Sequence, residues 1–179
     1  MSVEDALPAR LAIDLDGAFE DLVRTHQQLV FGAALRVTSN RADAEDVTQE
    51  TFVRAYRALG GYDGERVGAM RLRPWLARIA VNLAKNKVRR HRQSDPLDVD
   101  PADTGRGPED AAVAGDAAAL TGAALARLPE RYRTVVALRH IEGLSYAELA
   151  EAFDRPVGTV KAQVHRGLAL LRVALEEAQ

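Results

Sequence analysis

The segment between Gly143 and Lys161 constrains the fold of this chain more than any other part of its sequence. It predicts two short helices joined by a tight turn, because Ser145 can cap the first helix and Glu148 can return the hydrogen bond. Pro156 then interrupts the pattern, since proline lacks an N–H and moves the preceding residue out of the helical region. Such a pair is typical of a helix-turn-helix, whose second helix enters the DNA major groove.

The second of these helices has one apolar and one polar side. Apolar residues recur at helical spacing and predict a buried stripe of Val160, Val164, Leu168 and Leu171. The polar side offers groups that can contact phosphates or base edges. The candidate DNA-binding residues on it are Thr159, Lys161, Gln163, His165 and Arg166. Two helices of an ordinary bundle are the alternative, but the capping box, the breaker and the polar face together favour the helix-turn-helix.

Composition excludes several classes of protein. The 179 residues suffice for one ordinary domain or two small ones, and 28% charged and 47% hydrophobic residues are normal for a globular protein. No cysteine is present, which excludes disulfides and thiolate metal sites and fits a reducing cytoplasm. Residues 1–15 mix charged and short apolar stretches, unlike a signal peptide, and no apolar run is long enough for insertion into a membrane.

Charge is distributed unevenly along the chain, although the formal net charge is only -2. Residues 71–92 contain eight Lys and Arg and no acid, whereas residues 93–116 contain seven acids and the single base Arg106. The acidic stretch is also rich in proline and glycine and has few large apolar residues. It therefore predicts a flexible acidic linker, or alternatively a segment that lies along a positive groove of a partner.

The linker, residues 93–115, divides the chain into an N-terminal tail (1–15), a first domain (16–92) and a second domain (116–179). In the first domain, apolar residues at helical spacing predict helices over about 19–37, 42–59 and 74–92, with a loop before Pro74. No part of the chain alternates as a strand does. We therefore expect an all-α protein of two small helical domains.

Acidic and amide side chains form what we call the acidic patch in the first turns of the predicted helix over 42–59. Its members are Asp43, Asp46, Gln49 and Glu50. Acids at this end of a helix suit its dipole, which accounts for them without any function. The same residues also form one contiguous surface suited to a basic partner. The residues alone do not decide between these two explanations.

A basic stripe follows one face of the predicted helix from Pro74, with a cation or amide at Arg78, Asn82, Lys85 and Arg89. Such a stripe is typical of a helix that tracks phosphates, although a solvated basic face is the alternative. The loop before it can receive an unstacked base, while Trp75 is better explained as an anchor at the start of the helix. The candidate nucleic-acid residues are Arg71, Arg73, Trp75, Arg78, Asn82, Lys85, Asn86 and Arg89.

The sequence contains no convergent catalytic constellation. Its four histidines are scattered without metal-type spacing: His26, His91, His140 and His165. It has neither a phosphate-binding glycine loop nor a nucleophile motif. We therefore expect no enzymatic activity, no cofactor and no metal site.

Five segments occur in an order that is highly specific when they are taken together. They are residues 43–52 (DAEDVTQETF), 75–82 (WLARIAVN), 128–131 (LPER), 144–148 (LSYAE) and 158–161 (GTVK). From about Phe19 to Leu175, the chain resembles bacterial sigma factors of the extracytoplasmic-function (ECF) group of the sigma-70 family. The resemblance implies a cytoplasmic transcription initiation factor whose partners are core RNA polymerase, promoter DNA and an anti-sigma factor.

The resemblance also implies roles for the candidate residues. The first domain looks like the sigma-2 domain, so the acidic patch would face the polymerase clamp and the basic helix would open the minus-ten element. The loop over 61–73 would hold a flipped base. The second domain looks like the sigma-4 domain, so the polar side of residues 159–166 would read the minus-thirty-five element while the domain contacts the polymerase flap.

The chain departs from the family pattern in two places. Ala162 and Gln163 follow the GTVK segment where the family often has Ser-Arg, which removes a phosphate or guanine contact. The loop before Trp75 is also longer than usual. A conventional DNA-binding regulator is the main rival, but the α/β pattern of its receiver domain is missing, and a helical scaffold would leave the basic stripe unexplained. Because polymerase would position both domains, we expect the free protein to bind promoter DNA poorly.

Overall fold

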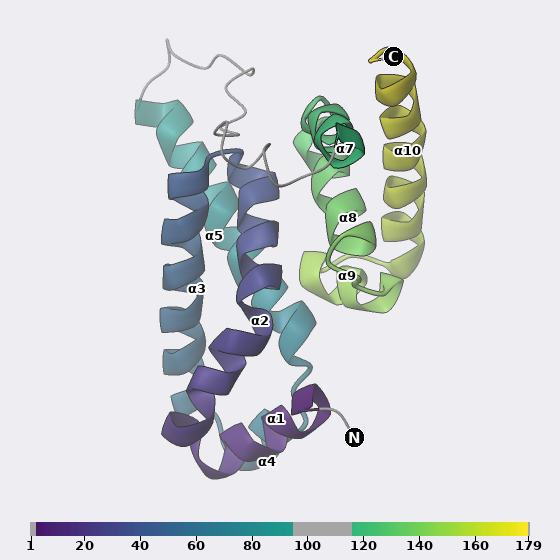
Figure 1. Cartoon of the computed structure of the whole chain (residues 1–179). Helices are drawn as coiled ribbons and strands as arrows, with labels where there is room; N and C mark the ends of the chain where they lie inside the picture. The colour runs from purple at the N-terminus through teal and green to yellow at the C-terminus, as the bar shows by residue number, and fades with distance from the viewer. Residues whose placement is uncertain (1–2, 95–115, 179) are drawn as a thin grey trace.

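The computed structural model describes residues 3–94 and 116–178, which form helices joined by short turns (Figure 1). The helices are α1 (Val3–Ile13), α2 (Leu15–Thr38), α3 (Arg41–Gly60), α4 (Gly64–Gly68), α5 (Leu72–Ser94), α7 (Asp116–Ala126), α8 (Glu130–His140), α9 (Tyr146–Phe153) and α10 (Val157–Glu176). No strand occurs within the described ranges, so the predicted all-α class is confirmed. The predicted linker lies outside these ranges from residue 95 to 115. We call α1–α5 the first module and α7–α10 the second module.

Side-chain caps set the ends of the two long helices α2 and α3. Asp14 begins α2 by accepting a hydrogen bond from the backbone N–H of Gly17 at 2.9 Å. Ser39 follows α2 in the left-handed region, with a φ of 55°, and Asn40 begins α3 by accepting from the N–H of Asp43 at 3.0 Å. These caps satisfy backbone groups that a helix end leaves free. The tight turn between them lays α2 and α3 side by side (Figure 1).

The segment predicted as an N-terminal tail instead forms helix α1, which packs against α2 and α4. Leu7 and Leu11 on α1 are buried, and Arg10 forms an ion pair with Asp21 at 2.7 Å. Two large apolar residues one turn apart are too short a pattern to predict a helix. Helix α1 therefore depends on its contacts with the rest of the first module.

The predicted loop before Pro74 contains one short helix, α4. Asp63 accepts a hydrogen bond from the N–H of Arg66 at 2.8 Å, and Val67 is buried beneath this turn. Helix α5 then begins at Leu72, two residues earlier than predicted, so that Pro74 lies in its first turn as expected. In that position the missing N–H costs no helical hydrogen bond.

Helices α2, α3 and α5 pack against one another as a bundle. Fully buried alanines occur on all three helices: Ala33 and Ala34 on α2, Ala44 and Ala55 on α3, and Ala77, Ala80 and Ala84 on α5. Such small side chains let helix backbones approach closely, and larger residues such as Leu22 and Leu76 fill the space between them. This packing buries the alanine face of α5 and leaves the opposite face of the helix exposed to solvent.

The second module contains the predicted helix-turn-helix. The capping box is confirmed, since Ser145 accepts from the N–H of Glu148 and the Glu148 carboxylate accepts from the N–H of Ser145. Asp154 follows α9 in the left-handed region, with a φ of 52°, and Pro156 directly precedes α10. The predicted inward stripe of α10 is also found, with Val160 fully buried.

The two modules share one hydrophobic core, which the sequence did not predict. Buried leucines of the second module, Leu144 and Leu149, belong to the same cluster as Leu72 and Leu76 of the first module. In this closed arrangement α9 packs against α5 and α8 packs against α2, so the modules lie side by side (Figure 1). Between the modules, the Arg133 guanidinium donates a hydrogen bond to the carbonyl of Arg36 at 2.9 Å.

Candidate nucleic-acid and polymerase surfaces

The basic stripe predicted on α5 is present on the outward face of the helix. Its members Arg78, Asn82, Lys85 and Arg89 are exposed, opposite alanines and Leu76 that are buried in the bundle. Before the helix, Arg71 is exposed and Arg73 is half-buried. Trp75 is half-buried and packs against the main core, as an anchor at the start of the helix would.

Asn86 flanks the basic stripe, one helical turn after Asn82. It lines a groove of about 510 Å³ between α3 and α5, together with Asp46 and Glu50 of the acidic patch. Its side-chain oxygen accepts a hydrogen bond from Arg89 at 3.3 Å. The structure therefore places this predicted DNA-binding residue at the border between the basic stripe and the acidic patch.

The acidic patch on α3 consists of one half-buried and three exposed residues. Asp46, Gln49 and Glu50 are exposed, whereas Asp43 is half-buried at the start of the helix. Lys87 of α5 contacts Asp43 at 3.1 Å and Asp46 at 2.6 Å, and the hydrogen bond that Lys87 donates to Asp46 is the main reason why the pKa of Lys87 is raised. Asp43 and Asp46 thus share Lys87 as a partner and Glu50 pairs with Arg54 at 2.7 Å, although Asp46, Gln49 and Glu50 remain exposed.

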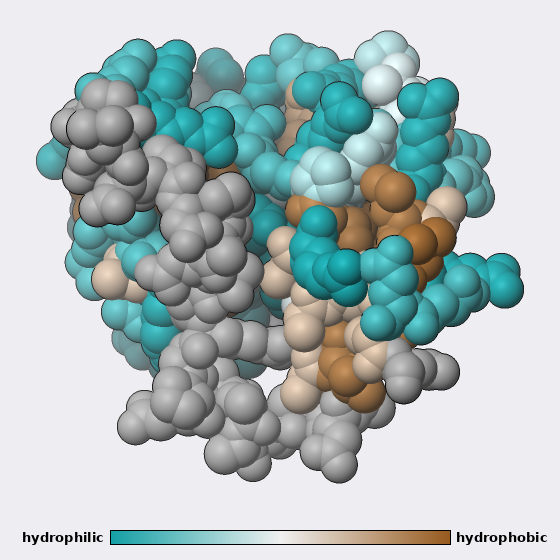
Figure 2. Space-filling view, turned by 90° about the horizontal axis from the view of Figure 1, so that it is seen from above, coloured by the Kyte–Doolittle hydropathy of each residue, from teal (hydrophilic) through white to brown (hydrophobic). Residues whose placement is uncertain are grey.

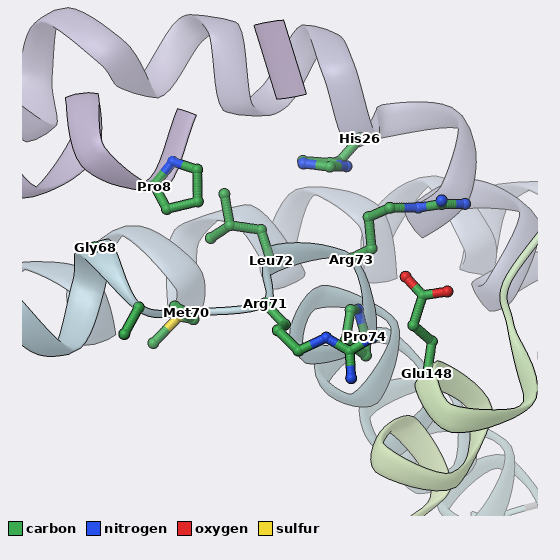
Figure 3. A pocket seen from close by; sticks show the side chains of 10 residues that line it. Pro8, His26, Gly68, Met70, Arg71, Leu72, Arg73, Pro74 and Glu148 are labelled. Atoms are coloured by element: carbon green, nitrogen blue, oxygen red, sulfur yellow. The ribbon is translucent and has the colours of Figure 1, made fainter. Parts of the chain in front are cut away.

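A pocket of about 450 Å³ lies in front of the basic stripe, between α1, the start of α5 and α9 (Figure 3). Apolar side chains such as Met70, Leu72 and Pro74 form part of its wall, and Arg71 and Arg73 supply positive charge. The pocket is formed largely by the segment in which the sequence predicted a flipped-base site.

His26 closes the floor of this pocket and is only 1% exposed. Its Nε2 atom is buried and has no hydrogen-bond partner among the described residues. Burial, with a smaller contribution from the charge of Arg73, lowers the pKa of His26 from 6.5 to about 4. The imidazole is therefore neutral at pH 7 and adds no charge of its own to the pocket.

Glu148 of α9 also lines this pocket, and Figure 3 shows its carboxylate directed toward the arginine side. Burial acts to raise the pKa of Glu148, but the hydrogen bonds with Ser145 and the charges of Arg73 and Arg71 outweigh it and lower the pKa. Glu148 is thus an anion that the second module places in a pocket of the first module.

Other contacts of the second module reach the N-terminal half of the basic stripe. Arg71 forms an ion pair with Glu151 at 3.1 Å, and Arg78 forms one with Asp154 at 3.4 Å. Arg73 donates a hydrogen bond to the carbonyl oxygen of Glu142 at 2.8 Å. In addition, the ammonium group of Lys85 lies 5.5 Å from the centre of the Phe153 ring. Sequence reasoning missed the acids of α9, although their recurrence at every third residue was visible.

The polar face of α10 carries the five residues predicted to read DNA. Thr159, Lys161, His165 and Arg166 are exposed, while Gln163 is half-buried. The side-chain oxygen of Gln163 accepts a hydrogen bond from Arg155 at 3.1 Å. Sequence reasoning also missed Arg155, which lies in the turn between α9 and α10. Its guanidinium lies beside Gln163, the position at which the family often has arginine.

Apolar surface gathers on the second module in the view of Figure 2. Exposed large apolar residues of this module include Leu120 on α7 and Leu170 and Val173 on α10. In the part of the chain that the structure describes, no helix is long and apolar enough to cross a membrane, and no three His, Cys, Asp or Glu residues cluster as metal ligands.

The helix-turn-helix and the basic helix of the first module together define a two-part DNA-binding protein of the transcription machinery. Two family descriptions match the corresponding segments: Sigma-70 region 2 over residues 22–94 and Sigma-70, region 4 over residues 119–171. The chain belongs to the ECF group of the sigma-70 family. It is a transcription initiation factor that binds core RNA polymerase and directs it to promoters.

Curated relatives match along most of their length. The chain is 34% identical to the ECF RNA polymerase sigma factor SigW of Bacillus subtilis, over 89% of this chain and 90% of the relative. It is 35% identical to the ECF RNA polymerase sigma-E factor of Haemophilus influenzae, over 94% of this chain and 93% of the relative.

Two solved structures share the fold. CnrH in complex with the cytosolic domain of CnrY matches with a TM-score of 0.71 and 28% identity, over 99% of this chain and 100% of CnrH. The sigma factor RpoE of Bartonella quintana, in complex with the anti-sigma factor NepR, matches with a TM-score of 0.69 and 21% identity, over 88% of this chain and 96% of RpoE.

Proposed function

We propose that the first module binds the polymerase clamp through α3 and opens the minus-ten element through α5. The proposed minus-ten surface consists of Arg71, Arg73, Trp75, Arg78, Asn82, Lys85, Asn86 and Arg89. The observation that carries this proposal is the outward basic stripe of α5 with an arginine-lined pocket at its start. A phosphate backbone can follow such a stripe while one unstacked base enters the pocket.

The proposed polymerase-binding residues are Asp43, Asp46, Gln49 and Glu50. Three of them are exposed on one side of α3, beside a groove to which Leu83 adds apolar surface. Exposed acids beside a groove with some apolar surface suit a basic and partly apolar partner, because charge complementarity steers the encounter while apolar burial holds the complex. Asp43 contributes chiefly by fixing Lys87, since its carboxylate is already engaged.

The second module is proposed to read the minus-thirty-five element through α10. The proposed residues are Thr159, Lys161, Gln163, His165 and Arg166. The turn before α10 leaves the N-terminal part of this helix accessible, as insertion into a major groove requires. The exposed apolar residues on α7 and α10 are proposed to contact the polymerase flap.

An anti-sigma factor is a further proposed partner, because both structural neighbours described above were solved with a bound regulator. The proposed place of action is the cytoplasm, where bacterial RNA polymerase transcribes. We also propose that the chain has no enzymatic activity of its own.

The proposed function is tested by run-off transcription with core polymerase, with and without the protein, on a set of candidate promoters. Specific initiation that depends on the protein is the expected result. Absence of initiation on every promoter, together with no binding to core polymerase, would contradict the proposal.

Reversing two charges of the acidic patch tests the polymerase surface. Asp46→Lys with Glu50→Lys should weaken binding to core polymerase about tenfold or more, because like charges would then face the basic clamp. The matched control is Glu20→Lys with Glu65→Lys, which reverses two exposed acids outside α3. Equal core affinity for the two double variants, measured by fluorescence anisotropy, would refute the assigned role of α3.

A further inference from the structure

We propose that helix α1 forms part of the minus-ten site, with Pro8 as an apolar wall against which the unstacked base packs. This inference rests on the proposed role of the pocket at the start of α5 and assigns a further residue to it. The Sigma-70 region 2 match begins at residue 22, so α1 lies outside the part of the chain that the family description covers.

Pro8 contributes its ring to the wall of the pocket. It is half-buried and lines the pocket of about 450 Å³ together with Met70, Leu72 and Pro74. Figure 3 shows the Pro8 ring on the α1 side of the pocket, across from Met70. An extruded base is held between aromatic or apolar side chains, and proline and methionine are among the apolar residues that pack against base faces. Pro8 and Met70 are therefore suited to the two faces of one base.

The stability of α1 does not explain why this position is a proline. Pro8 is the sixth residue of the helix, beyond the first turn in which a proline costs no helical hydrogen bond. Its ring replaces a backbone N–H that the interior of a helix would use, and alanine is by far the better helix former. Contact with a ligand in the pocket, in contrast, gives the flat apolar ring a use.

Contacts on both sides of Pro8 anchor α1 to the first module. Leu7 and Leu11 are buried in the main core, and Arg10 pairs with Asp21 of α2 at 2.7 Å. A wall residue on a helix anchored in this way is already in position, so a base that enters does not have to order it on binding.

Helix α1 also supports the opposite wall of the pocket, through α4. A Cβ on Gly64 would lie 3.3 Å from the carbonyl oxygen of Ala12, and one on Gly68 would lie 3.9 Å from the Ala12 Cβ. These two glycines therefore let α4 lie close against α1. Met70 follows α4 by two residues, so the contact between α1 and α4 helps to set the distance between Met70 and Pro8.

The floor of the pocket independently indicates a ligand with a polar edge. His26 lines the pocket and is 1% exposed, and its Nε2 atom has no hydrogen-bond partner among the described residues. A buried polar atom without a partner costs stability, which a hydrogen bond to a ligand would recover. The edge of a base offers both donors and acceptors to a neutral imidazole. Wall and floor thus address different parts of the same base.

The test replaces Pro8 by alanine in the holoenzyme, that is, in the protein bound to core polymerase. Pro8→Ala removes most of the ring but favours the helix, so the free variant should melt at the temperature of the parent or above it. The control is Ala9→Gln, at an exposed position of α1 that does not line the pocket. Weaker DNA binding by a Pro8 variant that melts in this way does not result from unfolding.

The probes are labelled single strands that carry the non-template minus-ten element of a promoter on which the protein directs run-off transcription. One strand is intact, and each of the others lacks one base of the element. The position at which base removal weakens binding to the parent holoenzyme most identifies the captured base. If removal of no base weakens binding, the proposed capture of a base is itself contradicted, and the inference with it.

By fluorescence anisotropy, Pro8→Ala should bind the intact strand roughly three- to tenfold more weakly than the parent, because one packing surface of the captured base is lost. On the strand without the captured base, parent and variant should bind equally, since no base is left for Pro8 to contact. The control should stay within about twofold of the parent on both strands. Equal weakening on both strands, or no weakening on the intact strand, would overturn the inference and leave the proposed function standing.

Chemical protection provides an independent measurement. The chain has no cysteine, so Pro8→Cys and Ala9→Cys each introduce a single thiol, whose alkylation in the holoenzyme is followed after separation of the subunits. The intact strand should slow alkylation at position 8 severalfold, whereas the strand without the captured base should not. Alkylation at position 9 should be the same with either strand. Equal alkylation of position 8 with the two strands would overturn the inference.

Discussion

His26 shows how a single buried side chain can link folding to pH. Its imidazole is almost completely buried beneath the pocket at the start of α5, and its pKa is lowered to about 4. In the unfolded chain the same group takes up a proton near its ordinary pKa of 6.5. Between these values the unfolded state binds more protons, so stability must fall as pH falls from 6.5 toward 4.

Replacing His26 by leucine should therefore flatten the acid limb of the stability profile. In the parent, the neutral buried imidazole of His26 contributes about 3 kcal/mol to the free energy of unfolding above pH 6.5, and this contribution is lost by pH 4. Chemical denaturation of parent and His26→Leu at a series of pH values measures it. The control is His140→Leu, at an exposed position of α8, and an equal effect of both substitutions would disprove the assignment.

Arg155, in the turn before α10, and Gln163, on α10, form a hydrogen-bonded pair beside the proposed DNA-reading face. The side-chain oxygen of Gln163 accepts the Arg155 hydrogen bond at 3.1 Å, which engages one of its two lone pairs and directs the oxygen toward Arg155, so the amide N–H groups are the more available partners for DNA. Pairing of glutamine with adenine needs both its oxygen and its nitrogen, whereas guanine offers two acceptors in the major groove. We therefore expect the pair to favour guanine at a base that Gln163 contacts.

Arg155→Ala should shift this preference from guanine toward adenine, because the Gln163 oxygen becomes free. The change is expected to be roughly 5- to 150-fold in relative use of the two bases, equivalent to one bidentate contact of about 1–3 kcal/mol. Run-off transcription on promoters that vary each minus-thirty-five position measures it. Arg127→Ala, which removes an exposed arginine paired with Glu177, should leave the preference unaltered. An unshifted preference in the Arg155 variant would contradict the role of the pair.

At the scale of elements, the sequence predicts those helices whose signals are local. The capping box, the proline before α10 and the apolar stripe of α10 each lie within a few residues of one another, and all three are found. Helix α1 was missed because its burial depends on α2 and α4, which no local pattern records. The groove that Asn86 lines was not predicted for a related reason, since only the packing of α3 on α5 forms it.

The crossing of α10 over α8 gives a stability prediction. A Cβ on Gly167 would lie 2.5 Å from Val136 Cγ2 in a buried contact, so Gly167→Ala should destabilise the second module by about 1–3 kcal/mol. Gly158→Ala is the control, because a Cβ there meets nothing within 4 Å and alanine favours the helix. Thermal melting should rank the control at or above the parent and the Gly167 variant below it. The reverse order would show that α8 can move away from α10 at little cost.

At the scale of the whole molecule, the closed arrangement could not have been predicted from one sequence. The basic stripe and the acids of α9 are both visible as patterns in the sequence. An ordinary charged helix face in contact with solvent would produce each pattern equally well. Only the shared core brings them together, through residues such as Leu72 and Leu149 that look like ordinary interior leucines of separate domains. The near-zero net charge follows naturally, because basic and acidic faces of the same chain balance each other.

The shared core also limits how this protein can change over generations. A substitution near Leu144 or Leu149 that alters the fit of α9 on α5 also alters the pocket that Glu148 of α9 lines at the start of α5. Mutations selected for their effect in one module would thus be filtered by their effect on the packing of the other. The two modules are inherited together, as parts of one interior rather than as two independent domains.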